Sequence, residues 1–254
     1  MAKFVLSCCL AVVLLVGAAS CFEDSKVERR EIGSANKSYD YFVFAQMWPQ
    51  TTCWNENRQW TDSQDTCTRC RIPVDSWTIH GFWPSSRHGG HPSNCQGNAF
   101  QANALSSELR EQLARKWPTY KNKVRLESFW GYEYKKHGSC ALDNNSMDSV
   151  TKYFAKTLEL LSKYDVGKAL EKSNIRPGGQ YNVREMAQAL KRAFGKNTYL
   201  QCKTNPQTHE QYIVQAQVCF DKSFHLIDCS ADKSRISNCS NKKDVIYPEN
   251  LKSC

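Results

Sequence analysis

Apolar residues recur every three or four positions in three segments of the chain, which is the spacing of one helix face. They are Leu105, Leu109, Leu113 and Trp117 in the first segment, Val150, Phe154, Leu158 and Leu161 in the second, and Val183, Met186, Leu190 and Phe194 in the third. Pro118 ends the first segment, Asp148 or Ser149 is placed to cap the second, and Gly195 ends the third. The pattern predicts three amphipathic helices.

Runs of aromatic and β-branched residues, and alternation of apolar with polar residues, predict strands on both sides of these helices. The segment YDYFVFAQMW (39–48) and the segment DSWTIHGF (75–82) are the first two candidates. Residues 212–220 alternate between two faces, and residues 224–229 are placed to return as a hairpin partner. Segment 51–70 is polar and carries cysteines, so it predicts a loop held by disulfides. Together the elements predict one α+β domain.

The N-terminus has the composition of an export signal. Lys3 precedes an apolar run over residues 4–16, and small residues follow at 17–20. That run is too short to span a bilayer, so residues 1–20 are predicted to be a cleaved signal peptide. Residues 21–38 then form a flexible, charged arm, and residues 39–254 form the folded domain. No later stretch predicts a membrane span; acylation of Cys21, as in a lipoprotein, is the weaker alternative.

The cysteine count agrees with export. Of the 13 cysteines, Cys8 and Cys9 leave with the signal, so 11 remain, or ten if Cys21 is also removed. Ten cysteines suit five disulfides in an oxidising compartment. Three sequons offer sites for N-glycans, at Asn36, Asn144 and Asn238. The formal charge of +9 is compatible with binding RNA, heparin-like polymers or anionic membranes, but it does not choose among them.

The stretch FWGYEYKKHGSC (129–140) concentrates chemistry-bearing side chains. On a helix that ends at Gly138, Glu133, Lys136 and His137 share one face. The helix dipole and Glu133 both favour an imidazolium at His137, so we expect this histidine to titrate around neutrality or above. The alternative, an ordinary amphipathic helix with an ion pair at its end, is the better interpretation of this segment alone.

The stretch WTIHGFWP (77–84) supplies a second histidine. By the period of a strand, His80 shares a face with Thr78 and Phe82. A lone histidine in a strand is usually structural. Two imidazoles on either side of a phosphodiester, however, can act as base and acid while a cation stabilises the phosphorane.

These two stretches resemble the two signatures of the ribonuclease T2 family. The family usually has His-Gly-Leu-Trp-Pro in the first signature and Phe-Trp-x-His-Glu-Trp-x-Lys-His-Gly-Thr-Cys in the second, in the same order. FVFAQMWPQTTC resembles its first core strand, and SMDSVTKYFAKTLELLSKYD resembles the helix that follows the second signature. The likeness covers roughly residues 40–250.

The resemblance implies an α+β fold with an antiparallel sheet core, several packed helices and disulfide staples. It also implies secretion, to the outside of the cell or to an endolysosomal compartment, and a monomer. The implied reaction is cleavage of single-stranded RNA without metal or cofactor, through a 2′,3′-cyclic phosphate to 3′-phosphate ends. DNA would not be cut, because the 2′-hydroxyl is the nucleophile.

Matching the signatures by position assigns roles to individual residues. His137 corresponds to the general base and His80 to the acid that protonates the leaving oxygen, while Glu133 and Lys136 correspond to residues that stabilise the pentacovalent phosphorus. Tyr132 stands where the family commonly has a third histidine that assists phosphate binding. A tyrosine can donate a hydrogen bond there but carries no positive charge. Trp48 and Trp83 are candidate base contacts, although core packing is the better expectation for most such aromatics.

The resemblance also implies the disulfides Cys95–Cys140, Cys202–Cys239 and Cys219–Cys229, with Cys53 bonded to Cys67 or Cys70 and Cys254 to the one left over. A zinc site of Cys67, Cys70, His88 and His91 is disfavoured, because exported cysteines usually oxidise and the histidine gap is short. His209 and His225 are expected to be structural. Two other classes of function remain: a secreted T2-like glycoprotein acting in recognition or signalling, and a basic polysaccharide-binding protein.

Overall fold

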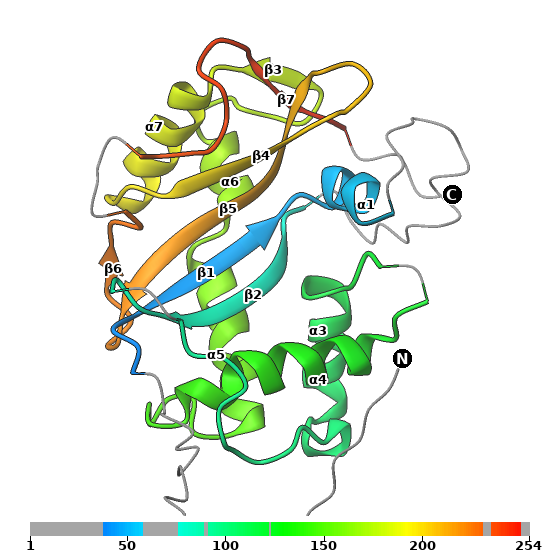
Figure 1. Ribbon diagram of the computed structural model, residues 1–254, viewed down its shortest axis with the longest axis vertical. Helices are drawn as coiled ribbons and strands as arrows, with labels where there is room; N and C mark the ends of the chain where they lie inside the picture. The colour runs from blue at the N-terminus through cyan, green and yellow to red at the C-terminus, as the bar shows by residue number, and fades with distance from the viewer. Residues whose placement is uncertain (1–37, 58–75, 89–90, 122, 231–234, 250–254) are drawn as a thin grey trace, which may run out of the picture. The chain divides into compact units, whose positions relative to one another are not determined.

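A β-sheet runs through the part of the chain that the computed structural model describes, residues 38–57, 76–88, 91–121, 123–230 and 235–249 (Figure 1). The expected signal peptide and the arm up to residue 37, with Asn36, lie outside these residues, as do Cys67, Cys70 and Cys254. The described residues all belong to one unit, residues 34–254.

The sheet has seven strands: β1 Tyr41–Met47, β2 Thr78–Ser85, β3 Gly179–Tyr181, β4 Tyr199–Thr204, β5 Gln211–Asp221, β6 Leu226–Ile227 and β7 Val245–Tyr247. Its order is β2-β1-β5-β7-β3, and β4 and β6 also pair with β5. All pairs are antiparallel except β5–β7, which is parallel. The predicted antiparallel core is confirmed, including the hairpin of β5 with β6.

The helices are α1 Pro49–Asn57, α3 Ser107–Lys116, α4 Leu126–Lys136, α5 Val150–Lys163, α6 Val166–Glu171 and α7 Val183–Phe194, with short 3₁₀ turns η1 Ala102–Ala104 and η2 Gly138–Ala141. The three helices predicted from apolar spacing are confirmed as α3, α5 and α7. Ser149 caps α5, and Gly195 ends α7 in the left-handed conformation with φ of 73°. None of the helices in the described ranges is long and apolar enough to cross a bilayer.

The prediction of a loop over segment 51–70 is wrong where it can be compared, because α1 occupies Pro49–Asn57. Proline at the first helical position is compatible with this start, since its missing N–H would have no helical acceptor there. The Thr52 hydroxyl donates to the Trp48 carbonyl. The helix has no apolar stripe, and for that reason periodicity did not reveal it.

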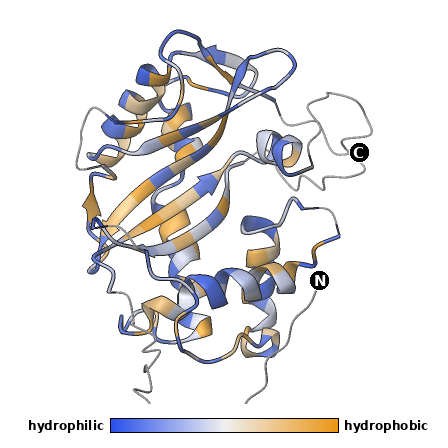
Figure 2. Cartoon of the chain, viewed as in Figure 1, coloured by the Kyte–Doolittle hydropathy of each residue, from blue (hydrophilic) through white to orange (hydrophobic). Residues whose placement is uncertain are grey.

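Aromatic side chains dominate the core between the sheet and the helices. Phe42, Phe44 and Phe82 are fully buried, and the Tyr153 hydroxyl donates to the Phe82 carbonyl from α5. Figure 2 shows hydrophobic residues along the central strands and both hydrophobic and hydrophilic residues on α4 and α7. This packing holds β2 and α4, which carry the two signature stretches, in one framework.

Candidate active site

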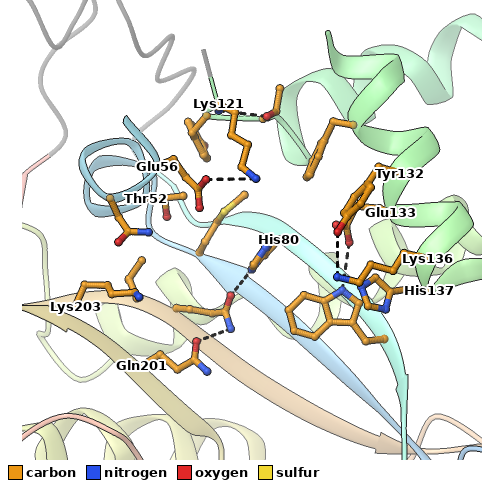
Figure 3. Close-up of a pocket in the computed structure, with 18 residues that line it drawn as sticks. Thr52, Glu56, His80, Lys121, Tyr132, Glu133, Lys136, His137, Gln201 and Lys203 are labelled. Carbon is orange, nitrogen blue, oxygen red and sulfur yellow. Dashed lines mark hydrogen bonds and ion pairs between the residues drawn. The ribbon is translucent and has the colours of Figure 1, made fainter. Parts of the chain in front are cut away.

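A pocket of about 560 Å³ brings the two signature stretches together (Figure 3). Its lining includes His80 and Trp83 from β2 and Tyr132, Glu133 and Lys136 from α4, with His137 directly after that helix. Further lining residues come from α1, β4, β5 and the segment before α4. The residues that the sequence assigned to catalysis and phosphate binding therefore lie in a single pocket.

A bulge in β2 positions His80. Gly81 pairs with Ala45 of β1, whereas Gln46 pairs with Ile79, so His80 is an extra residue without a partner on β1. Bulges of this kind redirect side chains and are common beside active sites.

The bulge changes which side chains of β2 share a face. His80 and Trp83 both line the pocket, while Phe82 is fully buried in the aromatic core. The prediction that His80 and Phe82 share a face is therefore wrong, because strict alternation is interrupted at His80. The backbone there is also fixed by the Trp117 indole, whose Nε1 donates to the His80 carbonyl at 2.9 Å.

The end of α4 positions the second histidine. The helix ends at Lys136, and the His137 N–H donates to the Glu133 carbonyl at 2.9 Å. The segment that follows is held by the Cys95–Cys140 disulfide, and the Asn94 N–H donates to the Lys136 carbonyl at 2.9 Å. The chain after the first signature is thereby tethered to the end of the second.

Trp83 lies between the two histidines. The centroid of its ring system is 5.1 Å from that of His80 and 5.5 Å from that of His137. Its Nε1 donates to Glu133 Oε2 at 3.2 Å. One indole thus contacts both imidazoles and the buried carboxyl group, and the expected contact of Trp83 with a base stays a prediction.

Gly81 makes this packing possible. A Cβ atom at position 81 would lie 2.7 Å from Glu133 Oε2 and closer still to Trp83 Nε1. Only glycine leaves room for the indole and the carboxyl group to meet above the strand.

Burial shifts the pKa values of several titratable groups in the pocket. It raises the pKa of Glu133 to about 7, against the opposing effects of the Trp83 hydrogen bond and the charge of Lys136. Burial, together with the charges of Lys136 and His80, lowers the pKa of His137 to about 3. The expectation that His137 titrates at or above neutrality is therefore wrong, because desolvation and the neighbouring cation outweigh the helix dipole.

His80 is also desolvated, and burial lowers its pKa, while a hydrogen bond to Gln215 opposes the shift. His80 Nδ1 bonds to Gln215 Oε1, and Gln215 Nε2 donates to Gln201 Oε1 at 2.8 Å. Gln201 and Gln215, from β4 and β5, were not identified from the sequence. The alternation of residues 212–220 placed Gln215 on one face of a strand but gave no sign that this face meets His80.

Lys136 and Tyr132 form a pair at the rim of the pocket. The Lys136 ammonium donates to the Tyr132 hydroxyl at 3.0 Å and lies 5.3 Å from the ring centroid. This hydrogen bond raises the pKa of Lys136, so the side chain stays cationic. Tyr132 is 54% exposed and therefore accessible to a substrate.

An ion pair that was not predicted lies on another side of the pocket. Lys121 Nζ is 3.6 Å from Glu56 Oε2, which comes from the last turn of α1. Lys203 of β4 also lines the pocket. These residues belong to no signature, and only the fold brings them to the site.

Trp48, the other candidate base contact, is buried away from the pocket. It is 1% exposed and does not line the pocket, its Nε1 donates to the Pro248 carbonyl, and its ring packs edge-on against Tyr247. Trp48 lies between β1 and α1, and its ring is packed in the core, which was the better expectation for most of these aromatics.

The remaining histidines and cysteines of the described residues do not line the pocket. His91 accepts from the Ser86 N–H, and His225 bonds to Asp221. Within the described ranges, no group of three or more His, Cys, Asp or Glu side chains is arranged to hold a metal ion. The structure contains the expected disulfides Cys95–Cys140, Cys202–Cys239 and Cys219–Cys229. Cys53 is also disulfide-bonded, and both of its expected partners lie outside the described residues.

Two sequons lie in the described part of the chain. The Asn144 amide donates to the Lys222 carbonyl and its oxygen accepts from the Ser146 N–H. The Asn238 side-chain oxygen accepts from the Cys202 N–H, and its amide nitrogen donates to the Cys202 carbonyl. Glycosylation at either position stays a prediction.

Comparison with known proteins matches residues 39–229 to the family model described as Ribonuclease T2 family. Ribonuclease Oy from Magallana gigas is 32% identical over 84% of this chain and 97% of its own length. Extracellular ribonuclease LE from Solanum lycopersicum is 31% identical over 77% and 83%. Among solved structures, a mutant of ribonuclease MC1, from bitter gourd seeds, in complex with 5′-GMP has a TM-score of 0.67 and 29% identity, covering 83% of this chain and 100% of that one.

Proposed function

This chain belongs to the ribonuclease T2 family and is a T2-type endoribonuclease, and we propose that it cleaves single-stranded RNA by acid–base catalysis from His80 and His137. The observation that carries the proposal is the convergence of both imidazoles on the Trp83 indole within one pocket. A phosphodiester bound between the rings has a proton acceptor on one side and a proton donor on the other.

The reaction proceeds in two steps. His137 takes the proton of the RNA 2′-hydroxyl, the O2′–P bond forms, the P–O5′ bond breaks, and His80 gives its proton to the leaving O5′. The products are a 2′,3′-cyclic phosphate and a 5′-hydroxyl. In the second step a water molecule opens the cycle to a 3′-phosphate, with the two histidines exchanging roles. DNA lacks the attacking hydroxyl and is not a substrate.

Lys136 and Glu133 stabilise the negative charge that develops on the phosphorane. Lys136 is cationic and is held in place by the Tyr132 hydroxyl. Because burial raises the pKa of Glu133 to about 7, its carboxyl group is protonated in mildly acidic solution. A protonated carboxyl group donates a hydrogen bond to the phosphoryl oxygens, whereas a carboxylate would repel them.

The pKa directions favour activity in acidic solution. His137 is neutral above about pH 3, so it can accept a proton throughout the acidic range. Burial lowers the pKa of His80 below its ordinary value, about 6.5, so the imidazolium needed as acid is lost before neutrality. The bound phosphodiester opposes this loss, since its negative charge favours the cation.

Export of the mature protein is part of the proposal. It rests on the composition of residues 1–20, on the three disulfides of the described residues, and on the match to a relative named as extracellular. We place the protein outside the cell or in an endolysosomal compartment, as a monomer with N-glycans on one or more sequons.

Digestion of single-stranded RNA by wild type, His80→Ala and His137→Ala tests the function. Each variant should lose at least about 10²-fold in kcat/KM, while His225→Ala, an exposed histidine outside the pocket, should match wild type. Undiminished cleavage by either pocket variant would refute the catalytic role of that histidine. A folded wild type that cleaves no RNA would favour recognition or signalling, and retention on heparin with no cleavage would favour polysaccharide binding.

A further inference from the structure

A chain of two glutamines connects His80 to the edge of the sheet. Gln215 of β5 is 6% exposed, and its Oε1 bonds to His80 Nδ1. The Nε2 of the same amide donates to Gln201 Oε1 of β4 at 2.8 Å. Figure 3 shows His80 and Gln201 at the two ends of this chain, on the wall of the pocket opposite α4.

The direction of these hydrogen bonds determines which nitrogen of His80 carries a proton. A side-chain amide has one acceptor oxygen and one donor nitrogen. When Gln215 donates to Gln201, only its oxygen is left to face His80. That oxygen can only accept, so Nδ1 must be the donor. The proton then stays on Nδ1 whether the ring is neutral or cationic, and Nε2 is the nitrogen that gains and loses a proton.

We propose that Gln215, oriented by Gln201, is a positioning residue that keeps Nδ1 of His80 protonated and reserves Nε2 for proton exchange with the substrate. The inference rests on the proposed function and deepens it. After His80 gives its proton to the leaving O5′, the neutral ring is already the tautomer with a free Nε2. It can therefore accept a proton from water in the second step without a rotation of the imidazole ring.

The backbone contacts and the other neighbouring side chains of His80 do not determine its tautomer. The bulge and the Trp117 hydrogen bond to the His80 carbonyl fix the position of the residue but do not contact the ring nitrogens. The Trp83 indole packs edge-on against the His80 ring and leaves its Nδ1 to Gln215. The charge of Glu56 raises the pKa of His80, and the charges of Lys121 and Lys136 lower it, but a charge selects no tautomer. The other charged or titratable side chains that line the pocket are Glu133, His137 and Lys203.

The direct test is the tautomer of His80 in the full-length wild-type protein. Long-range ¹H–¹⁵N spectra of histidine-labelled protein near pH 8 distinguish Nδ1–H from Nε2–H imidazole, and His80→Gln assigns the signal. We expect His80 as the Nδ1–H tautomer. A predominant Nε2–H tautomer would overturn the inference, and because the spectrum needs no substrate, this outcome is distinct from failure of the proposed function.

Two substitutions at Gln201 separate positioning from mere packing. Gln201→Lys offers only donors, so Gln215 must turn its oxygen toward the lysine and present its nitrogen to His80. We expect an Nε2–H tautomer and a loss of about 10- to 100-fold in kcat. Gln201→Glu offers only acceptors, so the hydrogen bonds of Gln215 keep their native direction. This variant should restore most of the activity that Gln201→Lys loses.

The added charge of Gln201→Lys is controlled by Gln207→Lys, at an exposed position outside the pocket, which should match wild type. If Gln201→Lys and Gln201→Glu have the same kcat and the same His80 tautomer, Gln201 does not orient Gln215 and the inference is wrong. If Gln201→Lys fails to fold, the His80 tautomer measured in the wild type is the test of the inference.

Discussion

Replacing Gly81 with alanine adds a methyl group at the point where Trp83 and Glu133 meet. The new Cβ atom would lie 2.7 Å from Glu133 Oε2 and nearer still to Trp83 Nε1. Because heavy atoms in contact lie about 3.5 Å apart, the indole or the carboxyl group must move by roughly 1 Å. The movement lengthens the 3.2 Å hydrogen bond between them and displaces the ring that contacts both histidines.

The expected cost has two parts. Losing the hydrogen bond to a buried group destabilises the fold by about 1–3 kcal/mol. A displacement of about 1 Å in a catalytic site can cost about 10²-fold in rate, so we expect kcat/KM on RNA at pH 5 to fall between about 10- and 100-fold. Steady-state cleavage of single-stranded RNA and thermal unfolding measure the two parts separately.

Gly195→Ala is the matched control. Gly195 has φ of 73°, and a Cβ atom there meets nothing within 4 Å. This variant should lose about 1 kcal/mol of stability through backbone strain alone and keep full activity. If Gly81→Ala folds as well as Gly195→Ala and cleaves RNA within about threefold of wild type, the packing above Gly81 does not position the site.

Three further predictions test single contacts. Tyr132→Phe removes the hydroxyl that holds Lys136 and should raise KM for RNA about fivefold, and an unchanged KM for Tyr132→His would show that this position does not bind phosphate. The pKa of Glu133 is about 7 in the folded state, above its unfolded value, so the free energy of unfolding of the wild type falls by up to about 3 kcal/mol between about pH 4.5 and 7. Measured by denaturant unfolding, Glu133→Gln should therefore be more stable relative to wild type at pH 8 than at pH 5. The same stability difference at both pH values would contradict this. Removing the Cys95–Cys140 disulfide by double serine substitution should lower the free energy of unfolding by about 2–4 kcal/mol in urea, and an unchanged midpoint would show that the tether is dispensable.

The arrangements that the sequence pattern predicted correctly are those that depend on near neighbours along the chain. Glu133, Lys136 and His137 lie together because helix geometry fixes positions three and four apart. The amphipathic helices α5 and α7 were predictable for the same reason, since their apolar stripes and caps are local features.

Other features depend on distant segments, and the local sequence pattern did not predict them. The β2 bulge arises from pairing with β1, so periodicity put His80 on the same face as Phe82. Gln215 meets His80 only because the sheet brings β5 beside β1. The low pKa of His137 depends on how completely the surrounding fold buries it, which no local pattern records.

The sharpest test of catalysis by His80 and His137 is the pH dependence of kcat/KM on single-stranded RNA, measured with identification of the products. We predict a bell-shaped profile that rises above about pH 3 as His137 becomes neutral and falls before about pH 6.5 as His80 loses its proton. The products should carry 2′,3′-cyclic phosphate and then 3′-phosphate ends, and EDTA should leave the rate unchanged. A profile that keeps rising above neutral pH, or 5′-phosphate products, would contradict catalysis by these two histidines.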